Sequence, residues 1–252
     1  MLTDKTYYFH TQPKTYQEAK DFIDLYCRSI RSSFDRHMVI SRHVPRGSHV
    51  LDYGCGWGTF SEMLHAERGC RVDGIDLDPH SIEIAKDIIG EQANLSFSVK
   101  HIGEIADETY EVVVSTQVIE HTFNPGFYLK ECNRVLQIGG LLIVSLPNII
   151  VPRYIYGLLA MSDSRVSFKR ISRTMKENHD RTHDHLQAWD PITFCRLVCA
   201  LGFEFVDYEP MEGLPLPRGH YWQHPWWRFK NLSYTMMFKV RKYKYVDIQP
   251  TD

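Results

Sequence analysis

The sequence predicts an α/β fold in which helices cover both faces of a largely parallel, doubly wound sheet. Three apolar runs have the length of parallel strands that are buried on both faces: 95–99, 112–115 and 141–146. Two further strands are expected at 49–51 and 71–76. Segments with helical patterns separate these runs, and this alternation is typical of a doubly wound sheet. Ligands of such sheets bind outside the carboxyl ends of the strands, so we expect a site near the first strand.

Pairs of Asp or Asn with Pro indicate where three of the helices begin. The Asp or Asn side chain can cap a helix, and proline suits the first helical position. Glycine favours the left-handed conformation that ends a helix. The predicted starts are Asp78-Pro79, Asn124-Pro125 and Asp190-Pro191, and the predicted ends are Gly90, Gly139 and Gly202.

The chain of 252 residues is expected to form one domain, 1–252, with three regions outside the central units. Apolar residues at helical spacing over 15–38 predict helices that pack over the sheet, within an N-terminal helical region 15–45. Residues 149–185 are too many for a simple connection, and we expect a cap insertion before the last core helix. Residues 203–210 and 233–242 are expected to close the sheet.

Composition excludes several classes of function. The chain has 29 basic and 31 acidic residues, which argues against a general nucleic-acid-binding surface. Its six cysteines form no CxxC pair and no disulfide framework, and we expect Cys195 and Cys199 to be core residues. We see no signal segment and no run long enough to cross a bilayer, so we expect a cytoplasmic protein without stable membrane insertion.

The most informative stretch is Asp52-Tyr53-Gly54-Cys55-Gly56-Trp57-Gly58, between the first strand and a helical pattern. Its glycines let the backbone pass close to a ligand, and the following helix offers unpaired N–H groups. Asp76 ends the next strand, where a carboxylate can accept both hydroxyls of a ribose. The spacing is not the GxGxxG of a dinucleotide site, and no P-loop lysine follows. These features predict a nucleoside site.

Four stretches, in this order, resemble the class I S-adenosylmethionine (SAM)-dependent methyltransferases of the small-molecule branch: 50–58, 74–78, 110–121 and 134–144. The resemblance implies a Rossmann-like, seven-stranded sheet whose last strand, 233–242, is an antiparallel edge strand. It also implies an enzyme that uses SAM and releases S-adenosylhomocysteine.

The resemblance assigns cofactor contacts by position. Asp52 would hold the loop and face the methionine ammonium, although a purely loop-bracing role is a serious alternative. Asp76 would bind the ribose, and Leu77 would lie against the adenine. The remaining expected cofactor contacts are Gly54, Cys55, Gly56, Gly58 and Gln117 near the methionine part, and the backbones of Ile102 and Gly103 near the adenine edge.

Methyl transfer to oxygen needs an aligned acceptor and benefits from a base, and histidine suits neutral pH. His121 follows the fourth strand, where a pocket-shaping role is equally consistent with its position. A second histidine precedes the last large helix in the resembled family. Counting back from the Asp190 cap selects His185, and matching the segment from its left end selects His183.

The segment 179–185 is rich in His and Asp, which suggests a metal site. It contains no established ligand pattern, so we predict no metal.

The resemblance favours transfer to a hydroxyl of a small-molecule acceptor, a sugar or a secondary metabolite. Three alternatives remain: N-methylation, C-methylation including cyclopropane synthase-like chemistry, and a non-catalytic SAM-binding protein. Ser115–Val118 stands where nucleic-acid adenine methyltransferases carry an Asn/Asp-Pro-Pro-aromatic motif, so a nucleic-acid substrate is disfavoured.

Two further clusters concern partners. Residues 220–229 contain three of the five tryptophans, and they predict a loop that closes the pocket, a grip for a flat or lipid-like acceptor, or a homodimer contact. The basic residues near the end of the chain are expected to be the solvated side chains of the last strand: Lys239, Arg241, Lys242 and Lys244.

Overall fold

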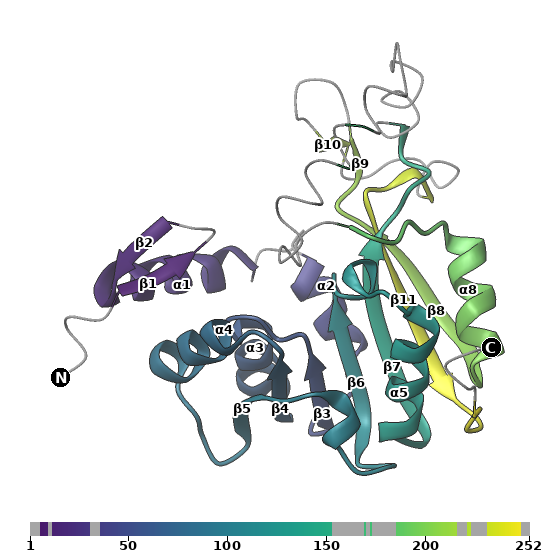
Figure 1. Ribbon diagram of the computed structural model, residues 1–252, viewed down its shortest axis with the longest axis horizontal. Coiled ribbons are helices and arrows are strands. Elements are labelled where there is room, and N and C mark those ends of the chain that lie inside the picture. Colours follow the sequence, from purple (N-terminus) through teal and green to yellow (C-terminus); the bar gives the residue numbers. More distant parts are fainter. Residues whose placement is uncertain are drawn as a thin grey trace.

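The computed structural model describes residues 6–9, 12–30, 36–152, 169, 172, 185–215, 221–222 and 231–247. Its centre is a seven-stranded sheet with the order β5-β4-β3-β6-β7-β11-β8 (Figure 1). The strands are β3 (His49–Tyr53), β4 (Arg71–Asp76), β5 (Leu95–Val99), β6 (Tyr110–Thr116), β7 (Leu136–Pro147), β8 (Phe203–Met211) and β11 (Thr235–Lys242). The α/β fold and all seven strands of this sheet agree with the sequence prediction.

The last strand is antiparallel, as predicted, but it is not at the edge. Strands β3 to β7 run parallel, and β11 pairs antiparallel with β7 on one side and with β8 on the other. The edge strand is β8. The burial pattern gives the reason, because most side chains of β11 are buried, whereas those of β8 are mostly exposed or half-buried.

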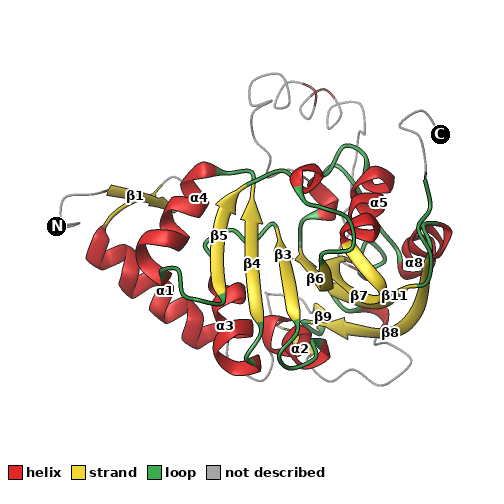
Figure 2. Ribbon diagram, turned by 90° about the horizontal axis from the view of Figure 1, so that it is seen from below, coloured by secondary structure: helices red, strands yellow, loops and turns green. Residues whose placement is uncertain are grey.

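Helices cover both faces of the sheet (Figure 2). On one face, α5 (Pro125–Val135) and α8 (Pro191–Ala200) contribute Leu129 and Phe194 to the larger core cluster. On the other face, α2 (Arg36–His43) and α3 (Thr59–Arg68) contribute Ile40 and Met63 to a second cluster. The two clusters hold the sheet as a buried middle layer.

The predicted caps form, although one predicted helix end is wrong. Asp78, Asn124 and Asp190 each accept backbone N–H groups at the start of α4 (Pro79–Ile84), α5 and α8. The predicted ends at Gly90 and Gly202 are confirmed: Gly90 closes the π-helical turn η1 (Ala85–Ile89) that continues α4, Gly202 follows α8, and each has φ = +84°.

Helix α5 ends at Val135, and not near Gly139 as predicted. Leu136 is already extended, fully buried, and paired with Tyr110 of β6. The register then shifts, so that Leu141 pairs with Val112. Gly139, with φ = +83°, therefore lies in an irregular start of β7 rather than at a helix end.

Two predictions about polar side chains are also wrong. Lys242 is only 1% exposed, and its Nζ donates to the backbone oxygen of Leu136 at 2.6 Å, whereas Arg241 and Lys244 are exposed. Lys242 is buried because β11 lies inside the sheet and not at its edge. The prediction for Cys199 is wrong, because α8 turns Phe194 and Val198 toward the core and leaves Cys199 exposed, whereas Cys195 is half-buried and packs against the core.

The N-terminal region contains the predicted helices. Helix α1 (Tyr16–Ile30) places Ala19 and Ile23 against Ile84 of α4, while α2 packs on the sheet itself. Two small hairpins were not predicted: β1 (Thr6–Phe9) with β2 (Gln12–Thr15), and β9 (Leu214–Pro215) with β10 (Tyr221–Trp222). The cap predicted at 149–185 and the tryptophan-rich segment fall mostly outside the described residues.

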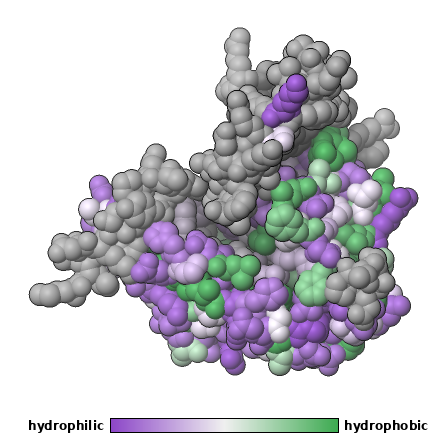
Figure 3. All heavy atoms as spheres, viewed as in Figure 1, coloured by the Kyte–Doolittle hydropathy of each residue, from purple (hydrophilic) through white to green (hydrophobic). Residues whose placement is uncertain are grey.

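The described surface seen in Figure 3 is mainly hydrophilic, with apolar side chains in separate groups. Among the helices in the described part of the chain, none combines the length and the apolar character needed to cross a bilayer.

Gly58, directly before α3, lies where the helix packs closely on the sheet. It has φ = +76°, and a Cβ atom there would lie 2.5 Å from Cε1 of Phe97. We expect Gly58→Ala to lower the free energy of unfolding by about 3 kcal/mol or more, since left-handed backbone costs about 1–2 kcal/mol and overpacking about 1–3 kcal/mol. Urea denaturation measures the loss.

Gly69→Ala is the matched control, because Gly69 has a similar φ of +67° with nothing within 4 Å of its Cβ position. Its loss should stay near about 1–2 kcal/mol. Equal losses in the two variants would show that the contact with Phe97 does not contribute to the destabilisation of Gly58→Ala.

Candidate functional site

The candidate site lies at the carboxyl ends of β3 and β6. From β3 the chain builds outward through β4 and β5, and it then returns to the other side of β3 with β6. The order of the strands therefore reverses at β3 (Figure 1), and open α/β sheets bind ligands in the crevice outside the carboxyl ends of the strands at such a point. The loop after β3 is the glycine-rich stretch singled out in the sequence.

The glycine loop is held against β4 and leaves one position open. The N–H groups of Gly54 and Cys55 donate to the backbone oxygen of Ile75 at 2.9 and 3.0 Å. A Cβ on Gly54 would lie 2.5 Å from Cγ2 of Val118, whereas nothing lies within 4 Å of that position on Gly56. Gly54 is thus required for packing, and Gly56 is free to meet a ligand.

Asp76 at the end of β4 is fixed by backbone donors. Its Oδ2 accepts the N–H of Gly56 at 2.9 Å, and its Oδ1 accepts the N–H of Asp78 at 2.9 Å. Each carboxylate oxygen has capacity for a further donor. A carboxylate oriented in this way suits two neighbouring hydroxyl groups, which is what its position in the sequence suggested.

An apolar surface lies beside Asp76. Leu77 is 61% exposed and Val99, at the end of β5, is 51% exposed. Val99 is the register partner of Asp76, so the two strand ends lie side by side. Exposed apolar side chains here can cover one face of a flat ring. Leu77 was predicted from the sequence and Val99 was not, although Val99 is an apolar residue at the carboxyl end of a strand.

The backbone groups proposed for Ile102 and Gly103 already have partners within the chain. The N–H of Gly103 donates to Nδ1 of His101 at 3.1 Å, and the oxygen of Ile102 accepts from Nη2 of Arg134 at 3.0 Å. The side chain of Ile102 is in the core. A ligand contact through Gly103 therefore requires His101 to turn away, and it stays a prediction.

A cavity of about 180 Å³ lies between the glycine loop and the N-terminal helices. It is lined by Tyr26, His37, Asp52, Gly54, Cys55, Gly56, Trp57, Thr59, Phe60 and Thr116. His37 stacks on the ring of Phe60, with 4.8 Å between centroids. Burial, reinforced by the charge of Arg36, lowers the pKa of His37 to about 3, so its imidazole is neutral. No motif in the sequence distinguished His37 from the other histidines.

Asp52 is buried in the wall of this cavity. Its Oδ2 accepts the hydroxyl of Ser61 at 2.6 Å, but its Oδ1 has no hydrogen-bond partner among the described residues. Burial raises the pKa of Asp52 to about 7; the Ser61 hydrogen bond opposes this, and the charge of Asp76 adds to it. The side chain thus braces α3 through Ser61 and keeps one oxygen for a donor.

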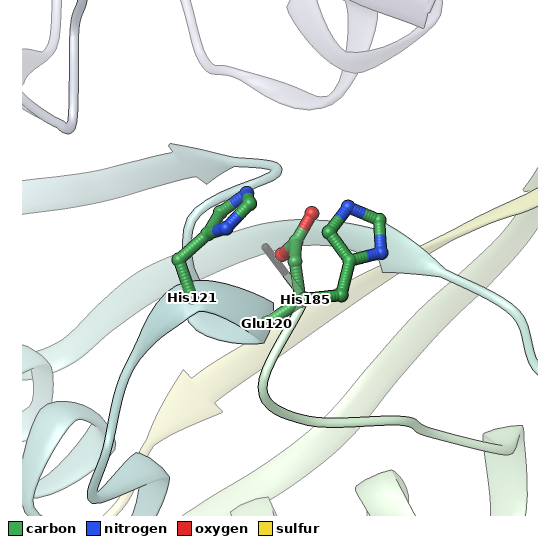
Figure 4. Close-up of side chains that lie close together, drawn as sticks. All are labelled: Glu120, His121 and His185. Carbon is green, nitrogen blue, oxygen red and sulfur yellow. The ribbon is translucent and has the colours of Figure 1, made fainter. Parts of the chain in front are cut away.

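The second side of the site is a cluster of Glu120, His121 and His185 (Figure 4). Glu120 is 1% exposed, and neither of its carboxylate oxygens has a hydrogen-bond partner in the part of the chain that the structure describes. Burial raises the pKa of Glu120 to about 7, although its own backbone N–H and the charge of Arg36 act against the rise. The rings of His121 and His185 meet edge to face, with 5.0 Å between centroids.

Backbone hydrogen bonds bring these residues together from distant parts of the chain. Glu120 and His121 belong to the short helix η3 (Ile119–His121), directly after β6. The N–H groups of Leu186 and Gln187 both donate to the backbone oxygen of Glu120, at 2.7 and 3.0 Å. One ligand atom from each of Glu120, His121 and His185 lies within 4.8 Å of the others. The alternative candidate His183 lies outside the described residues.

Residues 116–118 connect the two sides of the site. Val118 contacts Gly54, and Thr116 lines the cavity of the glycine loop. Between them, Gln117 has φ = +57°, and its N–H donates to the backbone oxygen of Ser145 at 2.9 Å. A non-glycine residue in this conformation is strained, and such strain is concentrated at functional sites. A short stretch of chain after β6 thus joins the cavity of the glycine loop to the polar cluster.

Comparison with known proteins agrees with this geometry. The family described as "Methyltransferase domain" matches residues 51–144. The "Ubiquinone biosynthesis O-methyltransferase" of Cereibacter sphaeroides is 35% identical over 131 residues, which are 50% of this chain and 51% of that protein. The chain therefore spans about half the length of this relative. The protein of the same name from Idiomarina loihiensis is 32% identical over 179 residues, which are 68% of this chain and 69% of that protein.

A solved structure shows the same fold. The S-adenosylmethionine dependent methyltransferase from Mesorhizobium loti superposes with a TM-score of 0.57 at 14% identity, over 81% of this chain and 96% of that chain.

The protonation of Asp52 predicts a pH-dependent stability of the ligand-free protein. Because its folded pKa of about 7 exceeds its unfolded value of 3.8, folding takes up a proton, and stability falls as pH rises from about 4 to 7. Asp52→Asn removes this loss while keeping an acceptor for Ser61. We expect the variant to match the wild type near pH 4 and to exceed it at pH 8 by about 1–4 kcal/mol.

Urea denaturation across this pH range measures the difference. Ser61→Ala, which keeps the carboxylate, should retain the decline with pH. Parallel pH profiles for the wild type and Asp52→Asn would contradict the assignment.

Proposed function

This chain belongs to the SAM-dependent methyltransferase family, and we propose from this that it transfers the methyl group of SAM to a hydroxyl oxygen of a small-molecule acceptor. The cofactor of this family is SAM, and its product is S-adenosylhomocysteine. The observation that carries the proposal is the placement of the Glu120, His121 and His185 cluster beside the glycine loop.

We place the ribose hydroxyls on Asp76, whose carboxylate is held by two backbone N–H groups. Leu77 and Val99 then cover one face of the adenine. The methionine part lies along Gly54, Cys55, Gly56 and Gly58 toward Gln117, and the open space at Gly56 supports this path. The partnerless oxygen of Asp52 suits the methionine ammonium, and the backbones of Ile102 and Gly103 are proposed at the adenine edge.

The acceptor hydroxyl is proposed to lie against His121 and His185. The sulfonium of SAM is already activated, so the protein chiefly has to align the hydroxyl oxygen with the S–CH₃ bond. Removal of the hydroxyl proton strengthens the nucleophile, and the cluster supplies two imidazoles for this purpose. His183 stays a second candidate on the same segment.

The class of acceptor rests on chemistry and on the relatives. An amine needs less help from a base than a hydroxyl does, so a buried carboxylate with two imidazoles favours oxygen over nitrogen or carbon. The relatives named above are O-methyltransferases of ubiquinone biosynthesis. Phenols therefore join sugars and secondary metabolites among the classes of acceptor that we propose. The acceptor is a small molecule, and a homodimer would leave this assignment unchanged.

Cofactor binding is tested by isothermal titration calorimetry with SAM and S-adenosylhomocysteine. We expect micromolar binding by the wild type and a loss of at least about 100-fold in Asp76→Ala, because two charge-assisted contacts and the anchor of Gly56 disappear. Asp73→Asn is the matched control, since Asp73 belongs to the same strand but contacts His49, Ser96 and Tyr110. Failure of the wild type to bind either compound would refute the proposed function.

Catalysis is tested by transfer of labelled methyl from SAM to a panel of catechol, 4-hydroxybenzoate and glucose. With an accepted substrate, we expect His121→Ala and His185→Ala to lower kcat by about 100-fold or more while SAM still binds. His80→Ala, at the start of α4, is the control and should keep the wild-type rate. Unchanged kcat in both cluster variants would exclude these residues from the chemistry.

A further inference from the structure

We infer that Glu120, His121 and His185 bind one divalent transition-metal cation at the acceptor side of the site. The binding site itself depends only on the geometry of these residues. Its role in catalysis rests on the proposed function, because the cation would act on the acceptor hydroxyl.

The first argument is the state of the Glu120 carboxylate. Both of its oxygens are buried without a hydrogen-bond partner in the described part of the chain. A buried carboxylate in this condition is costly, and such groups are normally paired or coordinate a metal. Asp52, the other buried acid of the site, has Ser61 as a donor, whereas no described side chain donates to Glu120. A cation between Glu120 and the histidines satisfies the missing interactions.

The second argument is the set of donor atoms. One carboxylate oxygen and two imidazole nitrogens are ligands that suit Zn²⁺, Mn²⁺, Fe²⁺ and Co²⁺. The three atoms lie within 4.8 Å of one another, and ligands about 2.1 Å from a tetrahedral metal are separated by about 3.4 Å. Small rotations of the exposed His185 side chain close this difference. Figure 4 shows the three side chains extending into the same space.

The third argument is that the backbone holds the ligands together without a metal. Glu120 and His121 are consecutive residues of η3. The N–H groups of Leu186 and Gln187, which donate to the backbone oxygen of Glu120, position the neighbouring His185. The preorganised backbone lowers the entropy that metal binding must overcome.

The surrounding charge is compatible with a cation. Arg36 is the positive side chain whose charge acts on Glu120. Its Nε lies 3.4 Å from Oε1 of Glu212, so an acid outside the cluster balances this charge. The Glu120 carboxylate remains the negative ligand.

Three protein ligands leave at least one coordination position for the acceptor oxygen. A metal at this position acts as a Lewis acid and favours loss of the hydroxyl proton, which passes to solvent. The oxygen then forms a bond to the methyl carbon while the S–CH₃ bond breaks, and S-adenosylhomocysteine leaves as a neutral sulfide. No oxidation or reduction takes place. With the metal bound, His121 and His185 are its ligands, and the metal replaces them as the group that promotes loss of the hydroxyl proton.

The experiment titrates the full chain, treated with EDTA and dialysed, with Zn²⁺ in calorimetry. Co²⁺ serves as a second probe, because its visible absorption reports coordination by the protein. We expect one equivalent to bind with micromolar or tighter Kd, and Glu120→Gln and His185→Ala to weaken binding at least tenfold. His185 is exposed, so its variant should fold even where Glu120→Gln does not.

The control is Glu209→Gln. Glu209 contacts His43 at 2.8 Å, which is an imidazole–carboxylate pair outside the cluster. This variant should bind Zn²⁺ as the wild type does. Three results would overturn the metal site: no binding of Zn²⁺ by the wild type, binding that neither cluster variant weakens, or an equal loss of affinity in Glu209→Gln.

The metal site and the proposed function fail in different ways. Metal binding without methyl transfer to any tested acceptor would retain the site and argue against the function. Methyl transfer that is unchanged after EDTA treatment, with no Zn²⁺ bound, would retain the function and remove the metal.

Discussion

The attachment of the glycine loop to the end of β4 is the constraint on which the rest of the site depends. Three consecutive N–H groups, those of Gly54, Cys55 and Gly56, point at the backbone oxygen of Ile75 and the carboxylate of Asp76. These bonds determine where α3 begins and which way its first turn faces. They also place Val118 against Gly54, so that the loop after β6 takes its position from the loop after β3. A local turn thereby aligns both sides of the crevice.

The two buried acids of the site illustrate different solutions to the same energetic problem. Removing a carboxylate from water is costly unless donors replace the lost solvent. Asp52 is partly compensated by Ser61, and protonation relieves the remainder when no ligand is present. Glu120 has no such side-chain donor within the described residues. Both acids therefore store free energy that a correctly placed positive group releases, which links the stability of the fold to occupation of the site.

The sequence predicted those features of the fold that depend on interactions between residues close together in the chain. Caps at Asp78 and Asp190, the strands, and Asp76 all follow from short-range pattern and turn chemistry. The position of β11 in the sheet could not be predicted in this way. An apolar strand has the same sequence pattern whether it pairs with one neighbouring strand or with two. Gly139 was misread because a positive φ serves a strand irregularity as well as a helix end.

The acceptor side was predictable only in part, for the same reason. His121 and His185 were both predicted, but they lie 64 positions apart in the chain, and no periodicity indicates that they meet. Their meeting depends on backbone donors from Leu186 and Gln187, which carry no mark in the side-chain sequence. The buried state of Glu120 likewise emerges only from tertiary packing.

Two points 40 positions apart in the sequence are joined directly, since the N–H of Ile149 donates to the backbone oxygen of Trp189 at 2.9 Å. Asn148 is secured independently, through donation to the backbone oxygens of Asn231 and Ser233. The entropic cost of lengthening a loop whose ends are already joined grows only slowly with its length. Changes in the number of residues between Ile149 and His185 therefore cost the fold little, and the backbone bonds from Leu186 and Gln187 to Glu120 keep His185 in its place.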